Sequence, residues 1–146
     1  MKTNVPFFLI LGISLTVIMA CSSKKGDRET MASQGREDWP EMESFHMVMA
    51  EAYHPYKDSA NLEPIKSLAE NLAKESATWA AAAPPPAVDN EEVKAMLEKL
   101  KTDCRGLADQ IKAGAPNEQI GASLTALHES FHTILEAWHH SKEKGR

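Results

Sequence analysis

The sequence predicts an all-α fold, an antiparallel up-down-up-down four-helix bundle preceded by a signal peptide and a flexible tether. Four segments beyond residue 38 place apolar residues three and four positions apart, the spacing of one helix face. Short loops rich in proline and glycine separate these segments, which favours antiparallel neighbours. No segment shows the alternation of a half-buried strand. Together these observations predict a bundle without strands.

Residues 1–20 have the pattern of an export signal. Lys2 gives a positive start, and an apolar run extends from Val5 to Ala20. With about 15 apolar residues, the run is shorter than the roughly 20 that a membrane-spanning helix needs. It ends in Ile18-Met19-Ala20-Cys21, which resembles the lipobox of bacterial lipoproteins. The resemblance implies cleavage before Cys21 and attachment of lipid to that cysteine.

The lipid on Cys21 would be the contact of the protein with a membrane. Several acyl chains hold a protein firmly on a bilayer, where a single chain does not. The protein is therefore expected to be lipid-anchored to the bacterial cell envelope and to face the periplasm. Ser22 and Ser23 follow Cys21, and no Asp stands at the second mature position. By resemblance to enterobacterial sorting, this favours the outer membrane.

Residues 21–38 are expected to form the flexible tether. They are polar and charged and contain almost no apolar side chains, so they cannot bury enough surface to fold. The predicted bundle domain occupies residues 39–146. Removing the first 20 of the 146 residues leaves 126, enough for one domain with a modest core.

Prolines delimit the first two predicted helices. The first extends from about residue 41 to 54, and Pro55 is expected to end or kink it. The second starts near Asn61, a good N-cap residue, and tolerates Pro64 in its first turn. It ends before the prolines at 84–86. The two apolar stripes consist of Met42, Phe45, Met49, Ala52 and Tyr56, and of Ile65, Leu68, Leu72 and Trp79.

The third predicted helix opens with Asp89 and carries Glu92 three residues later, a capping-box pattern. Gly114 is expected to stop it. The fourth begins at Pro116 and reaches about Ser141. Their stripes consist of Val93, Leu97, Leu100, Cys104, Leu107 and Ile111, and of Ile120, Leu124, Leu127, Phe131, Ile134 and Trp138. Cys104 lies in the middle of its stripe, so we interpret it as a buried, inert thiol.

The charge pattern argues against several functions. The formal net charge is −5, and it becomes −6 when Lys2 is removed with the signal. An acidic chain without a basic stripe is not expected to bind nucleic acid. There is no nucleophile elbow, no glycine-rich phosphate loop and no HExxH motif, so an enzyme is not expected. No pattern identifies a protein partner.

All six histidines fall on the first and fourth predicted helices. These helices are neighbours in an antiparallel bundle. At about 100° per residue, His128, His132 and His139 share one narrow arc beside the apolar stripe. His128 and His132 stand four residues apart, a spacing at which two imidazoles can hold one metal ion. The remaining histidines are His46, His54 and His140.

Antiparallel alignment predicts two ligand sets between these helices. The first consists of His54, His128 and His132, and the second of His46, Glu136 and His139. Imidazole and carboxylate suit Cu, Zn or Ni. Thioethers on the first helix, from Met42, Met47 and Met49, would favour Cu(I).

The segment Leu124-Thr125-Ala126-Leu127-His128-Glu129-Ser130-Phe131-His132 resembles the last helix of the class II cytochromes c, the cytochromes c prime. The family motif CxxCHxxF would place an axial haem ligand at His128 and the aromatic residue at Phe131. Leu124 and Leu127 replace both haem-attaching cysteines, which excludes covalent haem. The resemblance implies a four-helix bundle and an inward-facing His128.

Two alternatives accompany the metal hypothesis. Non-covalent haem could be held by His128 with Met42, His46 or Met49 on the opposite side, as in a b-type bundle. Alternatively, the domain is a structural or interaction module of the envelope without a ligand. The sequence favours a lipoprotein that binds a transition metal ion, ahead of haem or a ligand-free module.

Overall fold

The computed structural model describes residues 39–144, which belong to one compact unit. They form α2 (Pro40–Ser59), α3 (Glu63–Ala81), the short 3-10 helix η1 (Pro86–Val88), α4 (Glu91–Lys112) and α5 (Asn117–Lys144). No strand is present in this part of the chain. The predicted signal peptide 1–20, the tether 21–38 and Cys21 lie outside the described residues.

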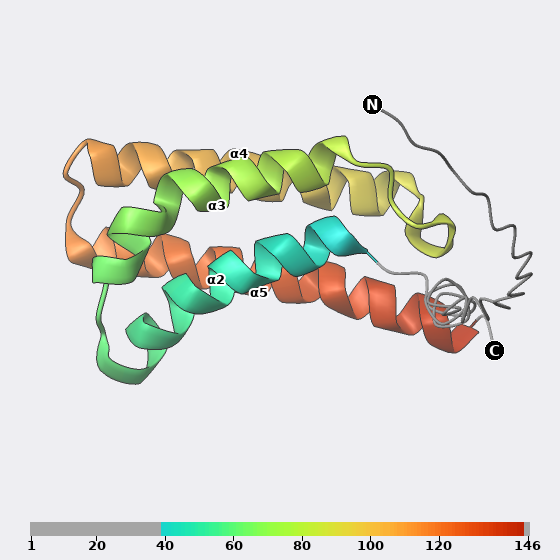
Figure 1. Ribbon diagram of the computed structural model, residues 1–146, viewed down its shortest axis with the longest axis horizontal. Coiled ribbons are helices and arrows are strands. Elements are labelled where there is room, and N and C mark those ends of the chain that lie inside the picture. Colours follow the sequence, from blue (N-terminus) through green and yellow to red (C-terminus); the bar gives the residue numbers. More distant parts are fainter. Residues whose placement is uncertain (1–38, 145–146) are drawn as a thin grey trace, which may run out of the picture. The chain divides into compact units, whose positions relative to one another are not determined.

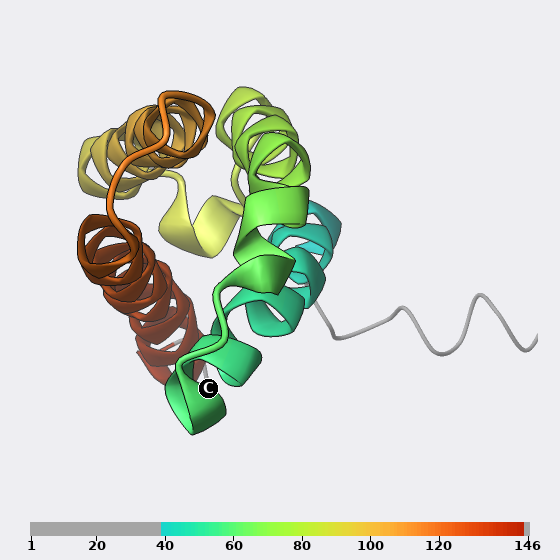
Figure 2. The same ribbon diagram turned by 90° about the vertical axis from the view of Figure 1, so that its left-hand side faces the viewer.

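Four helices connected by short loops form the predicted up-down-up-down bundle (Figure 1). Each helix packs along the next one in the chain, and α5 closes the bundle against α2. The backbones of α2 and α5 make the fewest close approaches of these neighbouring pairs. Figure 2 shows the four helices end-on, with the α3–α4 connection turned inward. The η1 helix in this connection contains the buried Val88 and packs on α5.

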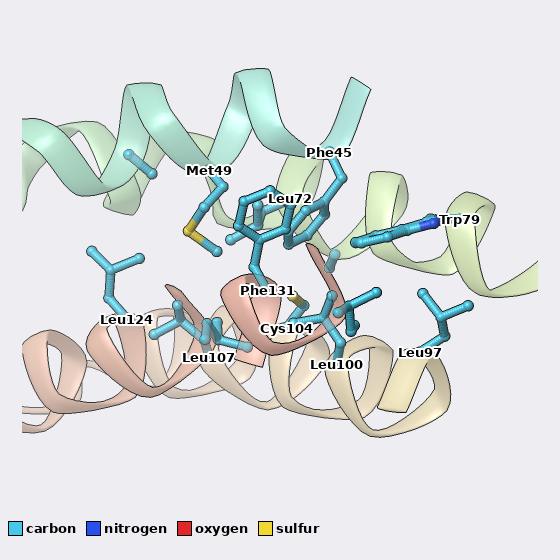
Figure 3. Close-up of a cluster of buried hydrophobic side chains, with 14 of the residues drawn as sticks. Phe45, Met49, Leu72, Trp79, Leu97, Leu100, Cys104, Leu107, Leu124 and Phe131 are labelled. Carbon is cyan, nitrogen blue, oxygen red and sulfur yellow. The ribbon is translucent and has the colours of Figure 1, made fainter. Parts of the chain in front are cut away.

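Apolar side chains from all four helices fill a single core (Figure 3). The predicted stripes supply most of it, which confirms their helical spacing. Phe45 and Phe131 lie fully inside the core and face each other from α2 and α5. The other labelled side chains in this view are Met49, Leu72, Trp79, Leu97, Leu100, Cys104, Leu107 and Leu124.

The three tryptophans meet in one part of this core. The ring of Trp39, the N-cap residue of α2, is 5.2 Å from that of Trp79 and 5.7 Å from that of Trp138, edge-on to both. The indole N–H groups of Trp39 and Trp79 are buried without a hydrogen-bond acceptor. Each unmet donor costs about 1–3 kcal/mol, which the burial of two large rings offsets.

Pro55 does not end the first helix, which was one of the two outcomes predicted for it. α2 continues through it to Ser59, although proline has no N–H to donate to the carbonyl of Glu51. The turn beyond Pro55 carries Tyr56, which is packed against Gly121 of α5. Packing of this half-buried ring against the core helps to offset the missing hydrogen bond.

Two of the predicted helix starts move by one or two residues. α3 begins at Glu63, whose N–H donates to the side chain of Asn61 at 3.0 Å; the N-cap residue itself is Leu62. The N-cap of α4 is Asn90, which accepts from the Val93 N–H at 2.9 Å, and Asp89 instead pairs with Lys94. The η1 turn, which the sequence did not indicate, shifts this start.

The end of α4 and the start of α5 agree with the sequence prediction. Gly114 has a φ of +74° and ends α4, as predicted. Its N–H donates to Ile111 and that of Ala115 to Gln110, which satisfies carbonyls of the last helical turn. α5 then starts directly after Pro116 and extends to Lys144, beyond the predicted end at Ser141.

Cys104 is buried, as its place in the apolar stripe predicted. Burial raises the pKa of its thiol to about 12, so the reactive thiolate is absent at neutral pH. None of the helices in residues 39–144 has an apolar stretch long enough to cross a bilayer.

The ion pairs gather on α3 and α4. Arg105 of α4 binds both carboxylate oxygens of Glu70 on α3, at 2.8 and 2.7 Å. Other pairs line α4 itself, such as Lys99 with Asp103. On α2 and α5, the described side chains form one pair, between His140 and Glu143 at 3.7 Å. The charged groups of the α2–α5 side are therefore largely uncompensated.

Two glycines provide a test of how closely α2 and α5 pack. A Cβ at Gly106 would meet nothing within 4 Å, whereas one at Gly121 would lie 2.5 Å from the Tyr56 hydroxyl oxygen. We expect Gly106→Ala to raise the free energy of unfolding by about 0.5–1 kcal/mol through helix propensity. The free energy of unfolding of Gly121→Ala should be at least about 1 kcal/mol lower than that of Gly106→Ala, because Tyr56 must move.

Urea unfolding of the full chain measures both variants. In a Tyr56→Ala background the difference between them should vanish. An equal gain for both variants in the native background would contradict the close packing of α2 on α5.

Candidate functional site

Aromatic rings and histidines fill the line of contact between α2 and α5, here named the α2–α5 seam. His46 of α2 stacks on Phe131 of α5 with ring centroids 5.0 Å apart and an interplanar angle of 21°. Tyr53 of α2 stacks on His128 of α5 at 3.8 Å and 13°. Flat side chains thus connect the two helices whose backbones make the fewest close approaches.

His128 and His132, here named the histidine pair, lie one helical turn apart on α5. Their Nε2 atoms are 3.2 Å apart, and the ring planes are inclined at 66°. Without an ion between them, one Nε2–H donates to the other Nε2, and the donor depends on the tautomer. His128 is half-buried and His132 is exposed, so solvent has access to the pair from one side.

Tyr53 holds the inner ring of the pair, a role that sequence reasoning missed. Its ring lies nearly parallel to the imidazole of His128 and covers one face of it. The contact restricts the His128 side chain and removes water from it. The only signal in the sequence was an aromatic residue on the seam side of α2, and such residues more often belong to the core.

His128 is kept neutral by its surroundings. Burial is the largest cause that lowers the pKa of His128 to about 4, from an ordinary value of 6.5. The charges of His132 on the same helix and of Lys57, His54 and His46 on α2 act in the same direction. A neutral imidazole has a lone pair available for a metal ion.

The predicted ligand sets come together only in part. His128 and His132 of the first set meet, whereas His54 is an exposed side chain that influences His128 only through its charge. In the second set, His46 stacks on Phe131. Within residues 39–144, no three His, Cys, Asp or Glu side chains form a metal-ligand group, which leaves His139 and Glu136 outside any such group. Of the predicted ligand sets, the described structure thus brings together only His128 and His132.

The methionines proposed for copper or haem differ in burial. Met49 is fully buried in the core, Met42 packs against it, and Met47 is 64% exposed. The rings of Phe45 and Phe131, 5.7 Å apart, occupy the space between the helices beside Met49. A haem held between His128 and a methionine of α2 does not fit there unless these rings are displaced.

The distance within the histidine pair, here that of a hydrogen bond, is also compatible with two ligands on one ion. Two nitrogens that each lie about 2.05 Å from Zn²⁺ are about 3.3 Å apart at the tetrahedral angle, and about 2.9 Å apart at a right angle. The observed 3.2 Å is closer to the tetrahedral value. For coordination, each ring must carry its proton on Nδ1, so that both Nε2 lone pairs face the ion.

Comparisons with known proteins add no relative: no protein-family model, no curated protein and no solved structure matches the chain.

The neutrality of His128 predicts a pH dependence of stability. Because its pKa of about 4 lies below the unfolded value near 6.5, the unfolded chain binds a proton that the folded chain does not. Stability should therefore fall as the pH decreases from 6.5 to 4. The ring is partly exposed, so we expect a loss of less than about 1 kcal/mol per pH unit.

Urea unfolding without metal, at a series of pH values, checks this. The His128→Gln variant should lose stability less steeply over that range, whereas His139→Gln, a change of an exposed histidine on the same helix, should keep the original slope. Identical slopes for the native chain and His128→Gln would refute the buried neutral imidazole.

Proposed function

We propose that the protein binds a divalent transition metal ion through the Nε2 atoms of His128 and His132. The observation that carries the proposal is the 3.2 Å separation of these two atoms. Two imidazoles one helical turn apart can hold an ion without any change in the backbone. The ion would replace the hydrogen bond between the rings.

The state of the two rings supports this assignment. Metal ions compete with protons for imidazole nitrogen, and a ligand that is already neutral at physiological pH pays no cost for deprotonation. With its pKa lowered to about 4, His128 carries no proton that an ion would have to displace at neutral pH. Tyr53 restricts the same ring before binding, which reduces the loss of side-chain freedom on coordination.

The pair favours Zn²⁺ over copper(I). Its nitrogen separation is near the tetrahedral value, and Zn²⁺ prefers tetrahedral sites. Cu²⁺ and Ni²⁺ also bind imidazole, and general affinity trends place Cu²⁺ above Zn²⁺. The thioethers that would select Cu(I) are divided between the core, at Met49, and open solvent, at Met47.

The site belongs, in this proposal, to a lipid-anchored protein of the bacterial envelope that faces the periplasm. The lipobox-like residues 18–21 support the anchor. A site with only two ligands from the chain leaves coordination positions open to other donors.

Thermal unfolding of the full chain with Zn²⁺, Cu²⁺ or Ni²⁺ tests the metal site. A ligand of the folded state at a hundredfold excess over its Kd adds about 2.7 kcal/mol. For a domain of this size, that raises Tm by about 10 °C. The gain should disappear in His132→Ala and persist in His139→Ala, because both residues are exposed on α5 but only His132 belongs to the pair.

No rise in Tm with any of the three ions would overturn the proposal. A rise that survives in His132→Ala would place the ion elsewhere. A rise with haem alone, accompanied by its absorption band, would favour the haem alternative.

The anchor has a separate test. When the chain is produced in a bacterium supplied with labelled fatty acid, the native protein should carry the label and sediment with the membranes. Cys21→Ser should carry no label, because the acylated thiol is gone. Label that persists in Cys21→Ser would exclude this residue as the lipid attachment point.

A further inference from the structure

The histidine pair leaves a tetrahedral ion half-coordinated. Zn²⁺ in structural sites almost always has four protein ligands. Within residues 39–144, no third His, Cys, Asp or Glu side chain joins His128 and His132. The remaining positions must be occupied by water or by donors from another molecule.

The pair is placed where another molecule can reach it. His132 is exposed on α5, and the half-buried His128 has Tyr53 stacked on one face. Helical spacing places Glu136 one turn beyond His132 on the same side of α5.

We propose that a second copy of this chain supplies the missing ligands, so that one metal ion joins two chains through four imidazoles. The inference rests on the metal site proposed above. Symmetric pairing about a two-fold axis brings the same patch of both chains together, and each chain then contributes its His128 and His132. The ion obtains the four nitrogen ligands that Zn²⁺ accepts.

The charges around the pair are compatible with such self-association. Lys57 of α2 lies near enough to His128 to influence its charge, and Glu136 follows His132 on α5. Both side chains are exposed, and neither forms an ion pair with another described residue. A patch that carries both signs can meet its own copy with opposite charges facing, whereas a patch of one sign repels it.

The pairing should depend on the metal. In the described part of the chain, Met47 is the one large hydrophobic side chain that is exposed. Stable association of metal-free chains usually requires a larger apolar patch. The ion therefore has to provide the attraction, and its removal should separate the chains.

Zn²⁺ titration of the full chain, followed by sedimentation velocity and by equilibrium dialysis of the metal, tests the inference. We expect the sedimenting mass to double as Zn²⁺ is added, with one ion bound per two chains. Addition of a chelator should restore the mass of the single chain. His132→Ala should neither bind the ion nor associate, whereas His139→Ala should do both like the native chain.

The two proposals fail in different ways. Binding of one Zn²⁺ per chain at constant mass would overturn the pairing and leave the metal site intact. Absence of any Zn²⁺ bound at His128 and His132 would remove both. A doubled mass that persists in His132→Ala, or that the chelator leaves unchanged, would show an association that the histidine pair does not cause.

Discussion

The stacking of rings across the α2–α5 seam is the interaction on which the candidate site depends. The backbones of α2 and α5 approach each other less than the other neighbouring helices do, and Phe45, Phe131, His46, Tyr53 and His128 close the gap. Flat rings bury large areas at low cost in side-chain freedom. This packing closes the bundle, and it also covers one face of His128. Stability and ligand chemistry therefore share the same contacts.

The two sides of the bundle differ in how their charges are satisfied. On α3 and α4, most charged side chains have partners, of which Arg105 and Glu70 are the best aligned. Such exposed pairs each contribute about 0–1 kcal/mol, so they add little to the stability of the fold. On α2 and α5, imidazoles and unpaired carboxylates face solvent. This surface also carries Lys57, so both signs of charge lie near His128.

The candidate site was predictable where its geometry is local. His128 and His132 belong to one helix, and the spacing of four residues places their rings together in any bundle. The ligands predicted from α2 depended on the alignment of two helices and on side-chain rotamers. His46 stacks on Phe131 and His54 points to solvent, because ring packing decided these rotamers. Tyr53 could not be separated from a core residue by its spacing alone.

In the fold too, features within one helix were predictable from the sequence, whereas features between helices were not. Apolar spacing determined that four helices form and which faces they bury, because 3.6 residues per turn fix neighbours within a helix. Gly114 determined a helix end through the left-handed backbone that glycine adopts. Only the tertiary structure decided that α2 continues past Pro55, since Tyr56 packs there against Gly121. It also decided that two histidines, and not three, converge, because distances between helices depend on how the side chains between them pack.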